Sequence, residues 1–107
     1  MRIEINRYGE SLKGYMYILQ CKDNSYYVGS TTDLSRRIEQ HNAGEGAEYT
    51  KRRLPVKLVY FEECGDIKTA FLREKQVQGW SRKKREALIA GDFDKVHNLS
   101  KKKFDDK

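Results

Sequence analysis

The stretch YYVGSTTDLSRRIEQHN, residues 26–42, decides the fold, because a strand pattern changes to a helix pattern within it. Its first three residues favour β-structure, Gly29 follows them, and Asp33 is a good N-cap for a helix. One face of that helix carries the positions spaced i, i+3, i+4 and i+7, namely Leu34, Arg37, Ile38 and His41.

Upstream of this stretch, the run YMYILQC, residues 15–21, is rich in β-formers. Polar residues separate it from Tyr26, with Asp23 and Asn24 as turn formers. The sequence therefore predicts a hairpin of two antiparallel strands.

Downstream, Pro55 precedes VKLVYFE, residues 56–62, which has the composition of a third strand. Asp66 and Ser81 are N-caps for helices over 67–80 and 82–90, and Gly91 ends the second. The predicted order is β-β-α-β-α-α. It describes a small α/β (α+β) domain, residues 14–91, with a three-stranded mixed sheet flanked by helices. Residues 1–13 are expected to be a flexible lead-in, and residues 92–107 a polar C-terminal tail.

The composition fits one small domain with a well-solvated surface. The 107 residues are 37% hydrophobic and 36% charged, and the formal net charge is +6. A positive charge favours a polyanionic partner, because neutralising phosphates releases counterions. A charged surface with no nucleic-acid role remains the alternative.

Cys21 and Cys64 form no pair with metal-ligand spacing, either alone or with His41 and His97. Free thiols in a reducing cytoplasm are expected. No apolar run is long enough to span a membrane, so we predict a cytoplasmic protein with no membrane partner.

Tyr17 and Tyr27 lie on the two strands of the hairpin, where they could face each other. A phenol has a pKa near ~10, and a nearby cation would lower it. Ordinary sheet aromatics are the alternative to a catalytic pair.

Arg37 and His41 are polar residues among Leu34 and Ile38 on the apolar helical face. The pattern fits a phosphate clamp, for which the guanidinium fork is suited. It also fits a helix rim whose polar ends reach water.

Glu74 lies on the apolar stripe formed by Ile67, Ala70, Phe71 and Val77. A carboxylate there must be paired, protonated or bound to a metal. One carboxylate with waters and phosphate oxygens is a common way to hold Mg²⁺. A salt bridge to Arg37 or to the neighbours of Lys75 is the alternative.

Two basic clusters could contact phosphates without reading sequence. Solvated surface is the alternative for at least half of their members. The residues expected to bind nucleic acid are Lys51, Arg52, Arg53, Arg82, Lys83 and Lys84.

Taken together, residues 14–90 resemble the GIY-YIG nuclease superfamily, specifically its small stand-alone bacterial members of the UPF0213 kind. Tyr17 matches the end of the first signature element, and Tyr27-Val28-Gly29 matches the second. Arg37, His41 and Glu74 follow at the family's arginine, histidine and glutamate positions.

The chain departs from the family pattern at two signature positions. Tyr15 stands where the first element has glycine, with Gly14 one place early, and Ser30 stands where some members have lysine. No residue is assigned to the asparagine that many members carry beyond the glutamate.

The resemblance implies a GIY-YIG endonuclease-like fold and one-metal hydrolysis of DNA phosphodiesters, in DNA repair or recombination. Glu74 would hold Mg²⁺ or Mn²⁺, and Tyr17 or Tyr27 would act as general base. Arg37 would stabilise the transition state, and His41 would orient a tyrosine hydroxyl or assist proton transfer. The implied partner is DNA, branched or single-stranded, with no small-molecule cofactor and with a monomeric or weakly dimeric protein.

Two other functions fit parts of the pattern. A catalytically weak or inactive module of the same fold would bind nucleic acid without cutting it. A protein-interaction domain would use the basic surface to dock an acidic partner, but this leaves the carboxylate of Glu74 without a task.

Overall fold

A computed structural model describes residue 5 and residues 12–105, and of residues 101–105 the backbone alone. The predicted lead-in at 1–13 therefore lies largely outside the described residues. The elements follow the order β1 (Gly14–Gln20), β2 (Tyr26–Thr31), α1 (Leu34–Asn42), α2 (Glu48–Lys51), β3 (Lys57–Cys64), α3 (Ile67–Gln78), α4 (Arg82–Ile89) and α5 (Phe93–Asp105).

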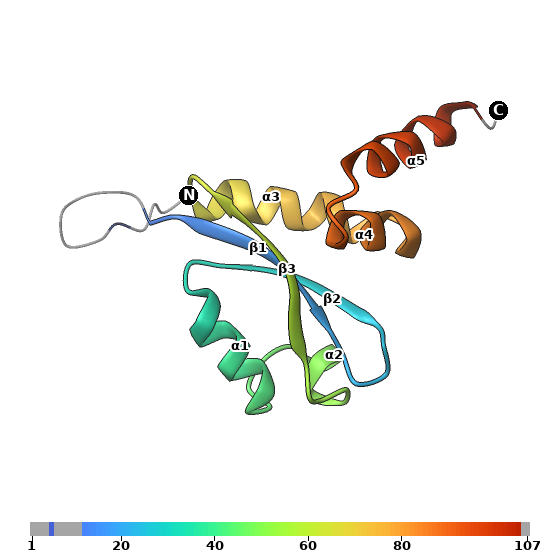
Figure 1. Ribbon diagram of the computed structural model, residues 1–107. Coiled ribbons are helices and arrows are strands. Elements are labelled where there is room, and N and C mark those ends of the chain that lie inside the picture. The colour runs from blue at the N-terminus through green and yellow to red at the C-terminus, as the bar shows by residue number, and fades with distance from the viewer. Residues whose placement is uncertain (1–4, 6–11, 106–107) are drawn as a thin grey trace.

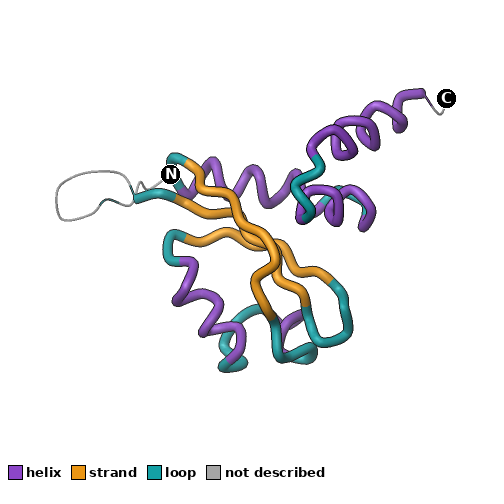
Figure 2. The backbone as a smooth tube through the Cα atoms, in the orientation of Figure 1, coloured by secondary structure: helices purple, strands orange, loops and turns teal. Residues whose placement is uncertain are grey.

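The three strands form one sheet with the order β2-β1-β3. The prediction of a small α+β domain with a three-stranded sheet is confirmed. The prediction of a mixed sheet is wrong, because both pairings are antiparallel. The strand β3 returns beside β1 after a connection that holds α1 and α2, and it runs opposite to β1 (Figure 2).

Helices cover both faces of the sheet. In Figure 1, α1 and α2 lie on one side, and α3 with α4 lies on the other. Because side chains alternate along a strand, the central strand β1 sends Tyr17 and Leu19 into one core, and Met16 and Ile18 into the other. Burial on both faces explains why YMYILQC is hydrophobic at every position except Gln20 instead of alternating.

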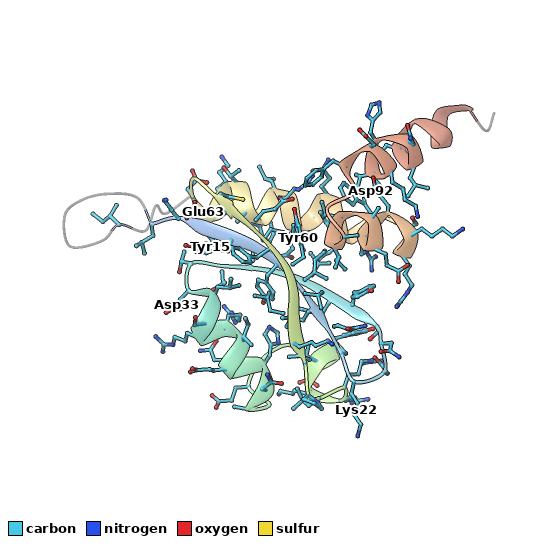
Figure 3. The ribbon with its side chains drawn as sticks, in the orientation of Figure 1. Tyr15, Lys22, Asp33, Tyr60, Glu63 and Asp92 are labelled. Carbon is cyan, nitrogen blue, oxygen red and sulfur yellow. The ribbon has the colours of Figure 1, made fainter. Side chains whose placement is uncertain are left out.

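The predicted helix caps are confirmed. The side chains of Asp33, Asp66 and Ser81 accept hydrogen bonds from backbone N–H groups in the first turns of α1, α3 and α4. Asp33 lies at the point where the chain leaves β2 and enters α1 (Figure 3). These caps fix where each helix begins.

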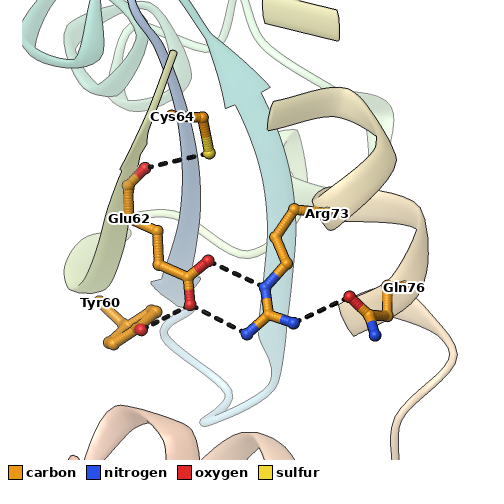
Figure 4. Close-up of polar contacts among 5 residues, drawn as sticks. All are labelled: Tyr60, Glu62, Cys64, Arg73 and Gln76. Atoms are coloured by element: carbon orange, nitrogen blue, oxygen red, sulfur yellow. Dashed lines mark hydrogen bonds and ion pairs between the residues drawn. The ribbon is translucent and has the colours of Figure 1, made fainter. Parts of the chain in front are cut away.

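Two features pin α3 to the sheet. A Cβ at Gly14 would lie 2.7 Å from the Cα of Ile67, so the glycine lets β1 approach the start of α3 closely. On β3, the carboxylate of Glu62 accepts hydrogen bonds from Arg73 at 2.8 and 3.0 Å and from the Tyr60 hydroxyl at 2.7 Å (Figure 4). These contacts orient the helix that carries Glu74.

Two helices were not predicted. The four-residue α2 lies in the loop expected between α1 and β3, and α5 lies in the expected polar tail. Cys21 and Cys64 are free thiols, as expected. In the described part of the chain, no helix has the length and apolar character needed to span a membrane.

Candidate functional site

An open hollow of about 490 Å³ lies along the edge strand β2. It gathers the predicted catalytic residues and the predicted metal ligand, although they come from two strands and two helices. Its walls include Tyr17, Tyr27, Gly29, Ser30, Arg37, His41, Glu45, Gly46, Ala47, Phe71 and Glu74.

A chain of buried hydrogen bonds runs from this hollow into the protein. The hydroxyl of Tyr17 lies 3.0 Å from Nε2 of His41, and Nδ1 of His41 lies 2.8 Å from Oγ1 of Thr50. The Thr50 hydroxyl in turn donates to the carbonyl oxygen of Ala47 at 3.0 Å. His41 and Thr50 are 1% and 0% exposed, so water does not compete for these groups.

The direction of each bond follows from the Thr50 hydroxyl, which has only one proton to donate. Because that proton goes to Ala47, Thr50 must accept from Nδ1–H of His41. Burial, reinforced by Arg37, lowers the pKa of His41, so the ring is neutral near pH 7 and its Nε2 carries a lone pair. Tyr17 therefore donates its hydroxyl proton to His41.

The expectation that a cation would lower the tyrosine pKa is wrong in its net direction. Burial, with Tyr27 next in effect, raises the pKa of Tyr17, and the opposing effect of Arg37 is smaller. The pKa of Tyr27 is also raised, by burial first and then by Glu74, against a smaller lowering by Arg37. Both tyrosines are therefore protonated near neutral pH.

Two glycines make room for the Tyr17–His41 pair. Tyr17 is paired with Gly29 across the sheet, and a Cβ at Gly29 would lie 2.5 Å from Cζ of Tyr17. A Cβ at Gly46 would lie 2.8 Å from Cγ of His41. Because contacts this close do not occur, any larger residue at either position would displace a ring.

Arg37 is half-buried at the hollow, and its guanidinium makes no hydrogen bond or ion pair with any described residue. Its positive charge acts to lower the pKa of Tyr17, of Tyr27 and of His41. Since a partly desolvated cation favours an anionic partner, this arrangement suits phosphate binding.

Glu74 is 9% exposed and has three partners. Its Oε1 accepts a 2.7 Å hydrogen bond from Ser30, and its Oε2 accepts one of 2.8 Å from Gln78. The ion pair is with Lys75 at 3.5 Å. The suggested salt bridge to Arg37 is absent among the contacts of the described residues.

The donor set fits a hard divalent cation held mainly by water and substrate. Within the described residues, no group of three or more His, Cys, Asp or Glu side chains could hold a metal. Glu74 offers one carboxylate at an open, polar hollow, and Mg²⁺ binds in this way when it keeps waters and phosphate oxygens as ligands. Glu74 is therefore the residue that would hold such an ion.

The six basic residues predicted to contact nucleic acid differ in the contacts that they make within the protein. Three pair with carboxylates: Lys51 with Glu48 at 3.2 Å, Arg53 with Asp23 at 3.0 Å and Arg82 with Glu86 at 3.2 Å. Lys84 lies over the Trp80 ring at 4.1 Å. Arg52 and Lys83 are exposed and have no ion pair in the part of the chain that the structure describes.

Several residues at the site were not singled out from the sequence. Thr50 and Gly46 lie against the ring of His41, which belongs to another element, and no local pattern marks them. Gln78 lies one helical turn from Glu74 in α3, so the i,i+4 spacing is the signal that could have found it. Ser30 was noted as a departure from the family lysine, and its hydroxyl proves to contact Glu74.

Comparisons with known proteins show the family of the chain. Residues 13–87 match the family described as the GIY-YIG catalytic domain. A UPF0213 protein of Haloquadratum walsbyi is 51% identical over 75 residues, which cover 69% of this chain and 83% of that protein. A UPF0213 protein of Streptococcus pneumoniae is 42% identical over 83 residues, covering 78% and 84%.

One solved structure supports the fold directly. The solution NMR structure of a protein from E. faecalis is 34% identical in sequence, with a TM-score of 0.53. The match covers 78% of this chain and 90% of that one.

Proposed function

The chain belongs to the GIY-YIG catalytic-domain family, a nuclease fold, and from that premise we propose that it is a divalent-metal-dependent endonuclease that hydrolyses DNA phosphodiester bonds. The observation that carries the proposal is the hydrogen bond from Tyr17 to the neutral ring of His41, in the same hollow as the unpaired Arg37 and the carboxylate of Glu74. A base, an anion-binding cation and a metal-binding carboxylate are the groups that phosphodiester hydrolysis needs.

The attacking water is activated by Tyr17 and His41 acting together. The raised pKa of Tyr17 makes a free phenolate too costly, so Tyr17 must lose its proton to Nε2 of His41 as it takes one from water. The lowered pKa of His41 keeps Nε2 free to accept that proton near pH 7. The bond from Nδ1–H to Thr50 holds the ring in this orientation and tautomer.

Arg37 binds the scissile phosphate and stabilises the charge that develops on it. Glu74 would hold Mg²⁺ or Mn²⁺, oriented by the hydrogen bonds from Ser30 and Gln78. Such an ion would supply positive charge at the phosphate and the leaving oxygen. Tyr27, half-buried and lining the hollow, positions the substrate beside Tyr17.

The test is cleavage of labelled single-stranded, duplex and branched DNAs with Mg²⁺, Mn²⁺ or EDTA. Glu74→Ala should abolish the metal-dependent product and leave DNA retention nearly unchanged. Glu63→Gln is the matched control, because that exposed carboxylate pairs with Lys13 and lies outside the hollow. Undiminished cleavage by Glu74→Ala would contradict the metal assignment.

Absence of product from the unaltered chain on every DNA, with salt-sensitive binding intact, would favour the non-catalytic binding module instead. The role in DNA repair or recombination, the cytoplasmic location and the oligomeric state stay predictions from the sequence.

A further inference from the structure

A second, smaller hollow of about 200 Å³ adjoins the catalytic one. Tyr27 lines both hollows. Gln78 lines the smaller one, and its amide donates to Glu74 of the larger one. The walls of the smaller hollow are Tyr26, Tyr27, Val28, Tyr49, Gln78 and Arg85. A ligand in it would therefore continue directly from one at the catalytic residues.

Tyr49 forms one wall and has the properties of a stacking platform. It is 39% exposed, although it is a large aromatic residue. Its ring lies 6.3 Å from the ring of Tyr27 with an interplanar angle of 27°. The guanidinium carbon of Arg53 lies 3.8 Å from the Tyr49 centroid, and Arg53 is itself fixed by Asp23 and by the Tyr49 carbonyl. The ring is thus held in place while part of its surface stays open.

The opposite wall has the same construction. The guanidinium carbon of Arg82 lies 4.5 Å from the centroid of Tyr26, whose hydroxyl donates to Glu86. Arg85 donates to three backbone carbonyl oxygens around the end of α3, so its charge is also fixed beside the hollow. The two basic clusters predicted to bind nucleic acid therefore each support one aromatic wall.

We infer that this hollow binds an unpaired base of the DNA strand whose neighbouring phosphate lies in the catalytic hollow. This rests on the proposed nuclease function for the identity of the polymer. Aromatic rings flanked by cations bind single-stranded nucleic acid by stacking on base faces while the charges contact the backbone. A base within a duplex cannot enter, because its neighbours already cover both of its faces.

The inference names a substrate class, DNA with unpaired nucleotides next to the cut, such as an overhang, flap or gap. It also predicts little sequence preference, because every base has a face that can stack.

The experiment measures binding in EDTA, so that no cleavage interferes. Two labelled DNAs of equal length are compared: a blunt duplex, and a duplex that ends in a single-stranded overhang. Tyr49→Ala should weaken overhang binding about 10- to 100-fold, the range for loss of one stacked base, and leave duplex binding essentially unchanged. Tyr49→Phe keeps the ring and is the matched control, expected to bind like the unaltered chain. Equal losses on both DNAs, or no loss, would overturn the inference.

A second measurement needs no variant. With 2-aminopurine in the overhang, binding of the unaltered chain should quench the fluorescence as the base stacks on a tyrosine. Binding without quenching would overturn the inference. Overhang preference without any metal-dependent product would contradict the nuclease function alone, whereas cleavage that is indifferent to Tyr49→Ala would contradict this inference alone.

Discussion

Replacing Thr50 by valine tests the proton chain of the site, because valine keeps the branched shape and removes the hydroxyl. His41 then has no acceptor for Nδ1–H at a position where it is 1% exposed. Leaving a buried N–H unpaired costs about 1–3 kcal/mol. The ring can escape this cost by moving its proton to Nε2, but Nε2 can then no longer accept the proton of Tyr17.

In both cases, the His41 tautomer with its proton on Nδ1, which is the one that accepts the proton of Tyr17, is destabilised by about 1–3 kcal/mol. At 1.36 kcal/mol for each tenfold in rate, single-turnover cleavage should slow by roughly 5- to 150-fold. This loss is at or below the lower end of the ~10²–10⁴-fold that a general base contributes, so residual activity should be measurable.

Thr50→Ser is the control, because it keeps the hydroxyl and removes a methyl group. It should lower the free energy of unfolding by roughly 1 kcal/mol through a small cavity while nearly preserving the cleavage rate. Cleavage is measured under single-turnover conditions below the melting temperature of each variant, and ¹⁵N NMR of the His41 ring reports the tautomer. An unchanged rate and tautomer in Thr50→Val, or an equal loss of rate in Thr50→Ser, would refute the reasoning.

The remaining predictions concern the support of the site. Gly46→Ala should displace the His41 ring and lower single-turnover cleavage at least about tenfold, whereas Gly65→Ala, whose Cβ meets nothing within 4 Å, should not. Glu62→Gln should lower the free energy of unfolding by about 1–2 kcal/mol in urea titrations, because it weakens a half-buried charged contact with Arg73; a loss no larger than that of the exposed Glu63→Gln would contradict this. Burial alone raises the pKa of Glu62, but hydrogen bonds from Arg73 and Tyr60 outweigh it and lower the pKa. The stabilisation by Glu62 should therefore be complete above the ordinary glutamate pKa near ~4.3 and decrease as the pH falls through the pKa of Glu62 in the folded protein. The free energies of unfolding of the unaltered chain and of Glu62→Gln should therefore converge in acid.

The elements with local signals were predictable, and the elements without them were not. Asp33, Asp66 and Ser81 each cap a helix through a bond three residues away, so the sequence alone indicates where those helices begin. The helix α2 has four residues and no side-chain cap. So short a helix is unstable by itself, and it depends on tertiary contacts such as that between Thr50 and His41.

The same distinction applies to the site. Glu74 was recognisable because a carboxylate on an apolar stripe requires a partner. Among its partners, Gln78 has a local signal at i+4, whereas Ser30, which lies 44 residues away on a strand, has none. Ser30 and Gln78 bind it, and Arg37 does not. Thr50 gives no signal, because a buried threonine on a short helix is ordinary until the ring of His41 is known to lie beside it.

The position of the site at a sheet edge explains how its two halves can meet. Alternation along β2 sends Tyr27 to one face of the sheet and Ser30 to the other, and Ser30 holds Glu74 on that second face. If β2 were a central strand, a further strand beside it would separate Tyr17 from Glu74. At β2, an edge strand that carries Gly29, no Cβ fills the gap, and in the part of the chain that the structure describes no further strand covers it. Tyr17 from one layer and Glu74 from the other therefore face the same hollow. Gly29 of the signature is needed there because it has no side chain to fill the space between them.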